Sequence, residues 1–143
     1  MQKVLVLCTG NSCRSQMAHG YIQKFAGDNV KVYSAGVEAH GVNPKTVKVM
    51  QEDGVDISHH TSNKADEYTR EKFDYIITVC DNAKENCPYF PGEAIRIHQA
   101  FTDPYNATGS EKEVLNVYRN VRDEIKSWSA GFVKEHISSA RIS

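Results

Sequence analysis

The residue types best suited to chemistry stand together near the start of the chain, in the segment Cys8-Thr9-Gly10-Asn11-Ser12-Cys13-Arg14-Ser15. Cys8 offers a nucleophilic sulfur, and the planar guanidinium of Arg14 matches two oxygens of a tetrahedral anion. Backbone N–H groups in a turn that opens a helix converge on one point and attract negative charge. We therefore expect residues 9–15 to bind an oxyanion beside Cys8. The same field should favour a reactive Cys8 thiolate at neutral pH.

The alternative for this segment is that Cys8 is a buried thiol at a strand end and Arg14 a solvated surface charge. The flanking elements favour the functional interpretation. Residues 3–7 are continuously apolar after Lys3 and predict a short buried strand. After Ser15, apolar side chains recur at helical spacing. A glycine at position 10 and a hydroxyl at position 15 complete a strand, loop and helix that could cradle an anion.

The rest of the chain alternates strand and helix patterns, which predicts an α/β fold with a doubly wound, four-stranded parallel sheet flanked by helices. Further strands are expected at 30–34, 73–79 and 94–98. Asn43-Pro44 should start one helix, and the Ser110-x-x-Glu113 capping box another. Cys8 and Cys80 each end a strand, and ligands bind at this edge of such sheets. The fold should thus bring the two cysteines together.

Composition narrows the class of protein. The chain has 143 residues, 40% of them hydrophobic, and a net charge of −1, which predicts one domain over 1–143 and gives no indication of nucleic-acid or membrane binding. It shows no apolar run of about 20 residues and no signal peptide pattern, so we expect a cytoplasmic protein, acting as a monomer. In that reducing compartment the four cysteines are typical of catalysis rather than structural disulfides. Their spacing does not match a zinc knuckle, and we expect no metal or cofactor.

Several motifs together resemble the thioredoxin-coupled arsenate reductases, which are built on the low-molecular-weight tyrosine phosphatase fold. They are CTGNSCRSQMA at 8–18, SAGVEAHGVNP at 34–44, SHHTS at 58–62, the pair Cys80 and Cys87 before Pro88, and FTDP at 101–104. The anion loop and the Asp-Pro pair are shared with the phosphatases. Gln16, residues 40–44 and the paired downstream cysteines are reductase-like, and they discriminate between the two activities.

The resemblance implies reduction of arsenate to arsenite, a detoxification reaction, by a cascade of three thiols. Cys8 would attack arsenate held by Arg14 and the loop, while Asp103 protonates the departing oxygen. Cys80 would then attack Cys8, release arsenite and leave a Cys8–Cys80 disulfide. Cys87 would move the bridge to Cys80–Cys87. Thioredoxin, or glutaredoxin, would act as the external electron donor, a choice that the sequence leaves open.

Smaller expectations accompany this mechanism. Ser15 should hydrogen-bond the Cys8 thiolate, and Asn11 should hold a left-handed backbone conformation. Residues 81–86 are polar and predict a short helix between Cys80 and Cys87. Some family members bind potassium beside the loop. Asn11 and Ser34 match that site, whereas His19 and Asn63 stand at its two acidic positions. Without those carboxylates, we expect no specific potassium requirement.

Two competing functions remain. A tyrosine phosphatase of the same fold would need Cys8, Arg14 and Asp103 but would have no use for Cys80 and Cys87. Tyr105 follows Asp103-Pro104, where an aromatic side chain walls the phosphotyrosine pocket of the resembled phosphatases, so residual phosphatase activity is also expected. The other alternative is an oxyanion- or redox-sensing module that binds without turnover. No role is assigned to four further histidines, which are His40, His59, His60 and His98.

Overall fold

The computed structural model describes residues 2–81, 90 and 92–138 of the chain. Its sheet has four strands in the order β2-β1-β3-β4, all parallel to their neighbours. The strands are β1 (Gln2–Cys8), β2 (Val30–Gly36), β3 (Tyr75–Thr78) and β4 (Ile95–His98). The chain moves outward from β1 to β2 and then returns past β1 to β3, which is the reversal of a doubly wound sheet. The predicted fold class, a parallel sheet flanked by helices, is confirmed.

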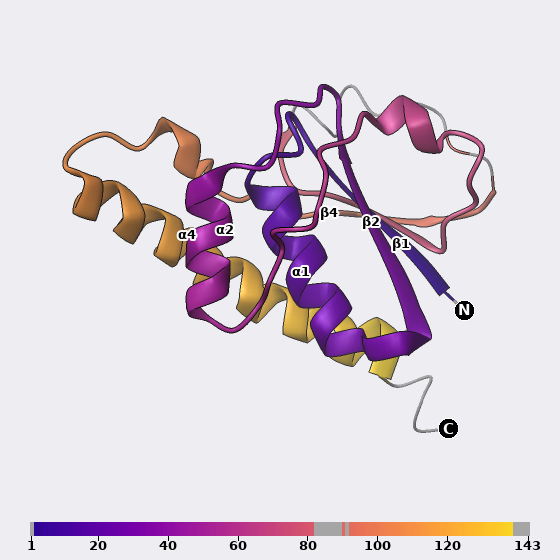
Figure 1. The fold of residues 1–143 in the computed structure, drawn as a ribbon. Helices are drawn as coiled ribbons and strands as arrows, with labels where there is room; N and C mark the ends of the chain where they lie inside the picture. Colours follow the sequence, from indigo (N-terminus) through magenta and orange to yellow (C-terminus); the bar gives the residue numbers. More distant parts are fainter. Residues whose placement is uncertain (1, 82–89, 91, 139–143) are drawn as a thin grey trace.

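Among the described residues, three α-helices pack together, with α4 running alongside both α1 and α2 (Figure 1). Their bounds are α1 (Arg14–Ala26), α2 (Pro44–Glu52) and α4 (Glu111–Phe132). Short helical turns occur at η1 (Gly27–Asn29), η2 (Ala65–Tyr68), η3 (Pro104–Asn106) and η4 (Val133–Ser138). Within the described ranges, no helix combines the length and the apolar character needed to cross a membrane.

Both helix starts predicted from capping residues are confirmed. The Asn43 side chain accepts a hydrogen bond of 2.8 Å from the backbone N–H of Lys45, and Pro44 is the first helical residue of α2. The Ser110 hydroxyl accepts from the backbone N–H of Glu113, whose carboxylate accepts in return from the Ser110 N–H. These caps satisfy backbone donors that a helix leaves unpaired at its first turn.

The strand bounds differ from the expected ones at the carboxyl edge of the sheet. β2 continues to Gly36, because Ala35 and Gly36 pair with the last two residues of β1. β3 ends at Thr78 instead of residue 79, although the Val79 N–H still donates to the Leu7 carbonyl at 2.9 Å. β1 and β3 are buried over the length that they share, which is the burial expected of central parallel strands.

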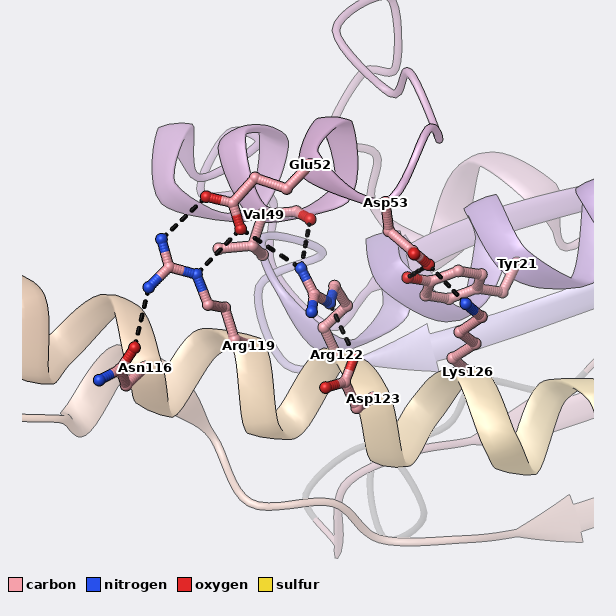
Figure 2. Close-up of polar contacts among 9 residues, drawn as sticks. All are labelled: Tyr21, Val49, Glu52, Asp53, Asn116, Arg119, Arg122, Asp123 and Lys126. Atoms are coloured by element: carbon pink, nitrogen blue, oxygen red, sulfur yellow. Dashed lines mark hydrogen bonds and ion pairs between the residues drawn. The ribbon is translucent and has the colours of Figure 1, made fainter.

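Polar contacts fix α2 against α4 and α1 (Figure 2). The Glu52 carboxylate accepts two hydrogen bonds from Arg119, at 2.9 and 2.8 Å. At the end of α2, the Asp53 carboxylate accepts from the Tyr21 hydroxyl at 2.7 Å and pairs with Lys126 at 2.9 Å. The start of α2 lies beside the loop that precedes α1, because the Asn43 N–H donates to the Ser12 carbonyl. These contacts therefore also fix the position of α2 relative to that loop.

Candidate active site

Cys8 and Cys80 lie at the same edge of the sheet because their strands are neighbours. Cys8 is the last residue of β1, and Cys80 follows β3 by two residues. β1 is also the strand at which the chain changes its winding direction, and crevices outside the carboxyl ends of such strands bind ligands. The loop from residue 9 to 13 then leads directly into α1 at Arg14.

Asn11 is the structural centre of this loop. It is the one non-glycine residue with a positive φ, 50°, in the part of the chain that the structure describes, which confirms the expected left-handed conformation. Its side chain donates to the Ser15 hydroxyl at 2.8 Å and accepts from the Asn63 N–H at 2.9 Å. The backbone carbonyl of Asn11 accepts hydrogen bonds from the side chains of Gln16, at 3.1 Å, and Ser62, at 3.0 Å. The predicted contact between Ser15 and the Cys8 thiolate stays a prediction.

The segment 37–43 supports the loop from outside, a role that the sequence analysis did not assign. Its backbone N–H groups donate to loop carbonyls in four places: Val37 to Cys8, Glu38 to Thr9, His40 to Gly10 and Asn43 to Ser12. The approach requires Gly36, because a Cβ at this position would lie 2.6 Å from the Thr9 carbonyl oxygen and 2.7 Å from the Asn11 nitrogen. The Ser-Ala-Gly motif at 34–36 was the available signal for this close packing.

A cavity of about 450 Å³ opens beside the loop. Its lining residues are Cys8, Thr9, Gly10, Ser12, Cys13, Arg14, His40, Gly41, Val42, Asn43, Pro44, Asp103 and Tyr105. Most of the predicted oxyanion-binding residues are therefore at its wall. Asn11 and Ser15 are not, because their buried side chains bond to each other.

The Arg14 side chain forms part of the cavity wall and is only 10% exposed. One terminal nitrogen, Nη1, donates to the Phe101 carbonyl at 3.2 Å, and Nη2 lies 3.4 Å from a carboxylate oxygen of Asp103. The buried Nε atom has no hydrogen-bond partner among the described residues. A buried guanidinium with spare donor capacity is suited to bind an oxyanion.

Asp103 is held at the mouth of the cavity by the turn that it begins. One carboxylate oxygen accepts from the Tyr105 N–H at 3.0 Å and caps η3, while the other faces Arg14. The side chain is 31% exposed, so it can exchange protons with solvent and still reach a bound anion. Cys8, Arg14 and Asp103 thus line one cavity, and their catalytic roles remain predictions.

The two cysteine thiols contact each other, and this changes the expected ionisation of Cys8. Both side chains are buried, and the Cys80 sulfur lies 3.3 Å from the Thr9 hydroxyl. A hydrogen bond with the Cys80 thiol, followed by burial, raises the pKa of Cys8, whereas Arg14 and the Thr9 amide lower it. The contact with Cys80 therefore opposes the expected Cys8 thiolate, which stays a prediction. Cys87 and the predicted helix within residues 81–86, beyond Asp81, lie outside the described residues.

The four positions compared with a potassium site form two hydrogen-bonded pairs. Asn11 bonds to Asn63, and a ring nitrogen of His19 lies 2.9 Å from the Ser34 hydroxyl. His19 also stacks on His60, with ring centroids 4.2 Å apart. Burial, followed by the charge of His60, lowers the pKa of His19 to about 3. The described residues include no group of three or more His, Cys, Asp or Glu side chains suited to hold a metal ion.

Comparisons with known proteins agree with this geometry. An arsenate reductase of Halalkalibacterium halodurans is 51% identical over 122 residues, which are 85% of this chain and 88% of that protein. A solved arsenate reductase in the phosphate-binding state superimposes with a TM-score of 0.80 at 30% identity, covering 94% of this chain and 98% of that one. A low molecular weight protein tyrosine phosphatase from T. tengcongensis gives 0.78 at 26% identity, covering 94% and 99%. The family model described as low molecular weight phosphotyrosine protein phosphatase matches residues 3–140, and the chain belongs to this family, among its arsenate reductases.

Proposed function

We propose that this protein reduces arsenate to arsenite in the cytoplasm, using thiols of its own chain. The observation that carries the proposal is the contact between Cys8 and Cys80 at the wall of a cavity that also holds Arg14. An oxyanion cradle with one thiol is sufficient for phosphate transfer. A second thiol against the first provides the electrons for a reduction. The arsenate reductases among its relatives support arsenate as the oxyanion.

The first step is attack of the Cys8 sulfur on arsenic. A Cys8–arsenate thioester forms, and one oxygen leaves as water after protonation from Asp103. Arg14 and the loop N–H groups hold the remaining oxygens. The Cys80 thiol raises the pKa of Cys8, whereas Arg14 favours its charged form. As the sulfur attacks, the Cys8 proton passes to the bound arsenate, so that the departing oxygen receives two protons in all and leaves as water.

The second step transfers two electrons to arsenic. The Cys80 thiolate attacks the Cys8 sulfur, the sulfur–arsenic bond breaks, and its electron pair leaves with arsenic as arsenite. Cys8 and Cys80 are then joined by a disulfide. Attack by Cys87 on Cys80 frees Cys8 and leaves a Cys80–Cys87 disulfide, which thioredoxin or glutaredoxin reduces by thiol exchange. In total, one arsenate and two thiols give arsenite, one disulfide and water.

A single-turnover experiment tests this scheme. The fully reduced protein is mixed with arsenate without any donor, and we expect one arsenite and the loss of two thiols per chain. Cys8→Ser and Cys80→Ser should release no arsenite. Cys87→Ser should complete one turnover and stop as the Cys8–Cys80 disulfide, identified by mass spectrometry. Parallel steady-state assays with thioredoxin and glutaredoxin systems then identify the donor.

Hydrolysis of aryl phosphates is a second candidate activity. Tyr105 is 70% exposed at the mouth of the cavity, directly after Asp103-Pro104, and an aromatic ring there can stack on a phosphate ester's aryl group. Such hydrolysis needs Cys8, Arg14 and Asp103 but no second thiol. Efficient hydrolysis without any arsenite release would identify the protein as a phosphatase and overturn the reductase proposal.

A further inference from the structure

His98 on β4 joins two residues that lie on either side of Cys80. One ring nitrogen, Nδ1, is 2.7 Å from the Thr78 hydroxyl, and the other, Nε2, is 2.9 Å from a carboxylate oxygen of Asp81. Thr78 and His98 occupy partner positions in the ladder between β3 and β4. The imidazole therefore spans from the last residue of β3 to the first residue after Cys80.

Among the described residues, the backbone hydrogen bonds at this junction hold Thr78 and Val79. The hydrogen bonds that carry β4 past the end of β3 are Gln99 N–H to the Thr78 carbonyl and Phe101 N–H to the Val79 carbonyl. For Asp81, the contact with His98 is the one hydrogen bond recorded among the described residues. Its side chain is 80% exposed, whereas that of His98 is 26% exposed. The imidazole is thus the anchored member of the pair, and it restrains the exposed residue.

The contact is compatible with either charge state of the imidazole. A neutral ring donates a hydrogen bond from Nε2 to Asp81 and accepts one from the Thr78 hydroxyl at Nδ1. A protonated ring donates from both nitrogens, and the Thr78 hydroxyl then acts as acceptor. The restraint on Asp81 therefore does not require a particular protonation state of His98.

Cys80 is the residue whose position this restraint decides. Its sulfur must attack the Cys8 sulfur in line with the sulfur–arsenic bond, and small displacements of a reacting atom lower the rate steeply. The sulfur is already buried, in contact with Cys8 and 3.3 Å from the Thr9 hydroxyl. Rotation of the chain at Asp81 would draw it away from that position.

We propose that His98 is a positioning residue for disulfide formation, which holds Asp81 and thereby keeps the Cys80 sulfur against Cys8. The inference rests on the proposed arsenate reduction, and it concerns only the step in which Cys80 attacks. Binding of the anion involves neither His98 nor Asp81. Because the Cys80 thiol raises the pKa of Cys8, a displaced Cys80 should leave attack by Cys8 no weaker.

The test uses Asp81→Ala, which removes the contact at an exposed side chain. We expect the single-turnover rate of arsenite release to fall about tenfold. The KM for arsenate should stay at its wild-type value, and the hydrolysis of an aryl phosphate should not fall. Asp81→Asn retains an acceptor oxygen for His98 and should restore most of the rate. Asp123→Ala is the matched control, because it removes another exposed carboxylate from an ion pair, on α4. Its rate of arsenite release should equal that of the wild type. His98→Phe should reproduce the loss seen with Asp81→Ala.

The outcomes are separable. Wild-type release rates in both Asp81→Ala and His98→Phe would overturn the role of His98 while leaving the reductase proposal intact. A parallel loss of aryl phosphate hydrolysis would also overturn it, because the pair would then act on the whole loop. If the wild-type protein itself released no arsenite, the proposed function would fail, and this inference with it.

Discussion

Arg14 is more than a source of positive charge at the cavity. Its guanidinium bridges the Phe101 carbonyl and Asp103, and its buried Nε remains without a partner among the described residues. This arrangement orders the mouth of the cavity and keeps one donor available for a bound oxyanion. A lysine ammonium could neutralise the same anion. It could not also donate to the Phe101 carbonyl and pair with Asp103 in the fixed geometry of a planar guanidinium.

Arg14→Lys should therefore lose most arsenate reduction while the protein stays folded. Loss of a charge-assisted hydrogen bond costs about 1.5–3 kcal/mol, which corresponds to roughly ten- to a hundredfold in kcat/KM. Coupled steady-state kinetics measure the change, and circular dichroism checks the fold. Turnover near wild type would remove the bidentate fork from the mechanism.

At the scale of elements, the cavity depends on how α1, α2 and α4 are fixed relative to one another. Tyr21 of α1 and Lys126 of α4 meet at Asp53, the residue directly after α2 (Figure 2). The Tyr21 ring is fully buried, so its hydroxyl makes the one polar contact that this side chain needs inside the core. Three helices thus share a single anchoring carboxylate.

Tyr21→Phe should lower the free energy of unfolding by about 1 kcal/mol, because one hydrogen bond to a carboxylate is lost while the ring still fills its space. Urea denaturation measures the difference. Tyr33→Phe is the matched control, since the described contacts of Tyr33 are made by its ring, and it should change stability less. An equal effect of both substitutions would show that the bond to Asp53 contributes nothing particular.

At the scale of the whole molecule, two partly buried imidazoles link stability to pH. Burial, then the charge of His60, lowers the pKa of His19 to about 3, and burial, then His59, lowers that of His60 to about 4. Asp56 opposes the shift at His60 without reversing it. Both pKa values lie below the ordinary 6.5. Between about pH 6.5 and 4, these two imidazoles therefore bind protons in the unfolded chain but stay neutral in the folded one.

The free energy of unfolding should therefore fall as the pH decreases from about 6.5 towards 4. Urea denaturation at a series of pH values measures this slope. His19→Asn, which can still bond to the Ser34 hydroxyl, should flatten it, whereas His40→Asn, at an exposed histidine paired with Glu38, should not. A slope unchanged by His19→Asn would assign acid sensitivity to other groups.

Features that depend on neighbours along the chain were determined by the sequence alone. The strand before Cys8, the helix after it, the caps at Asn43 and Ser110 and the left-handed Asn11 were all predicted. Each follows from local spacing or from a side chain that bonds to its own backbone a few residues away. The order of strands and helices then limited the topology to a parallel sheet with Cys8 and Cys80 at one edge.

Only the tertiary structure decided how groups far apart in the sequence affect one another. The Cys80 thiol raises the pKa of Cys8, where the loop alone predicted a thiolate. Residues 37–43 support the loop through backbone hydrogen bonds, for which Gly36 was the signal available in the sequence. His98 reaches Asp81 only because β4 pairs with β3 in one register. Ionisation and positioning depend on distances between atoms of different elements, and packing alone sets those distances.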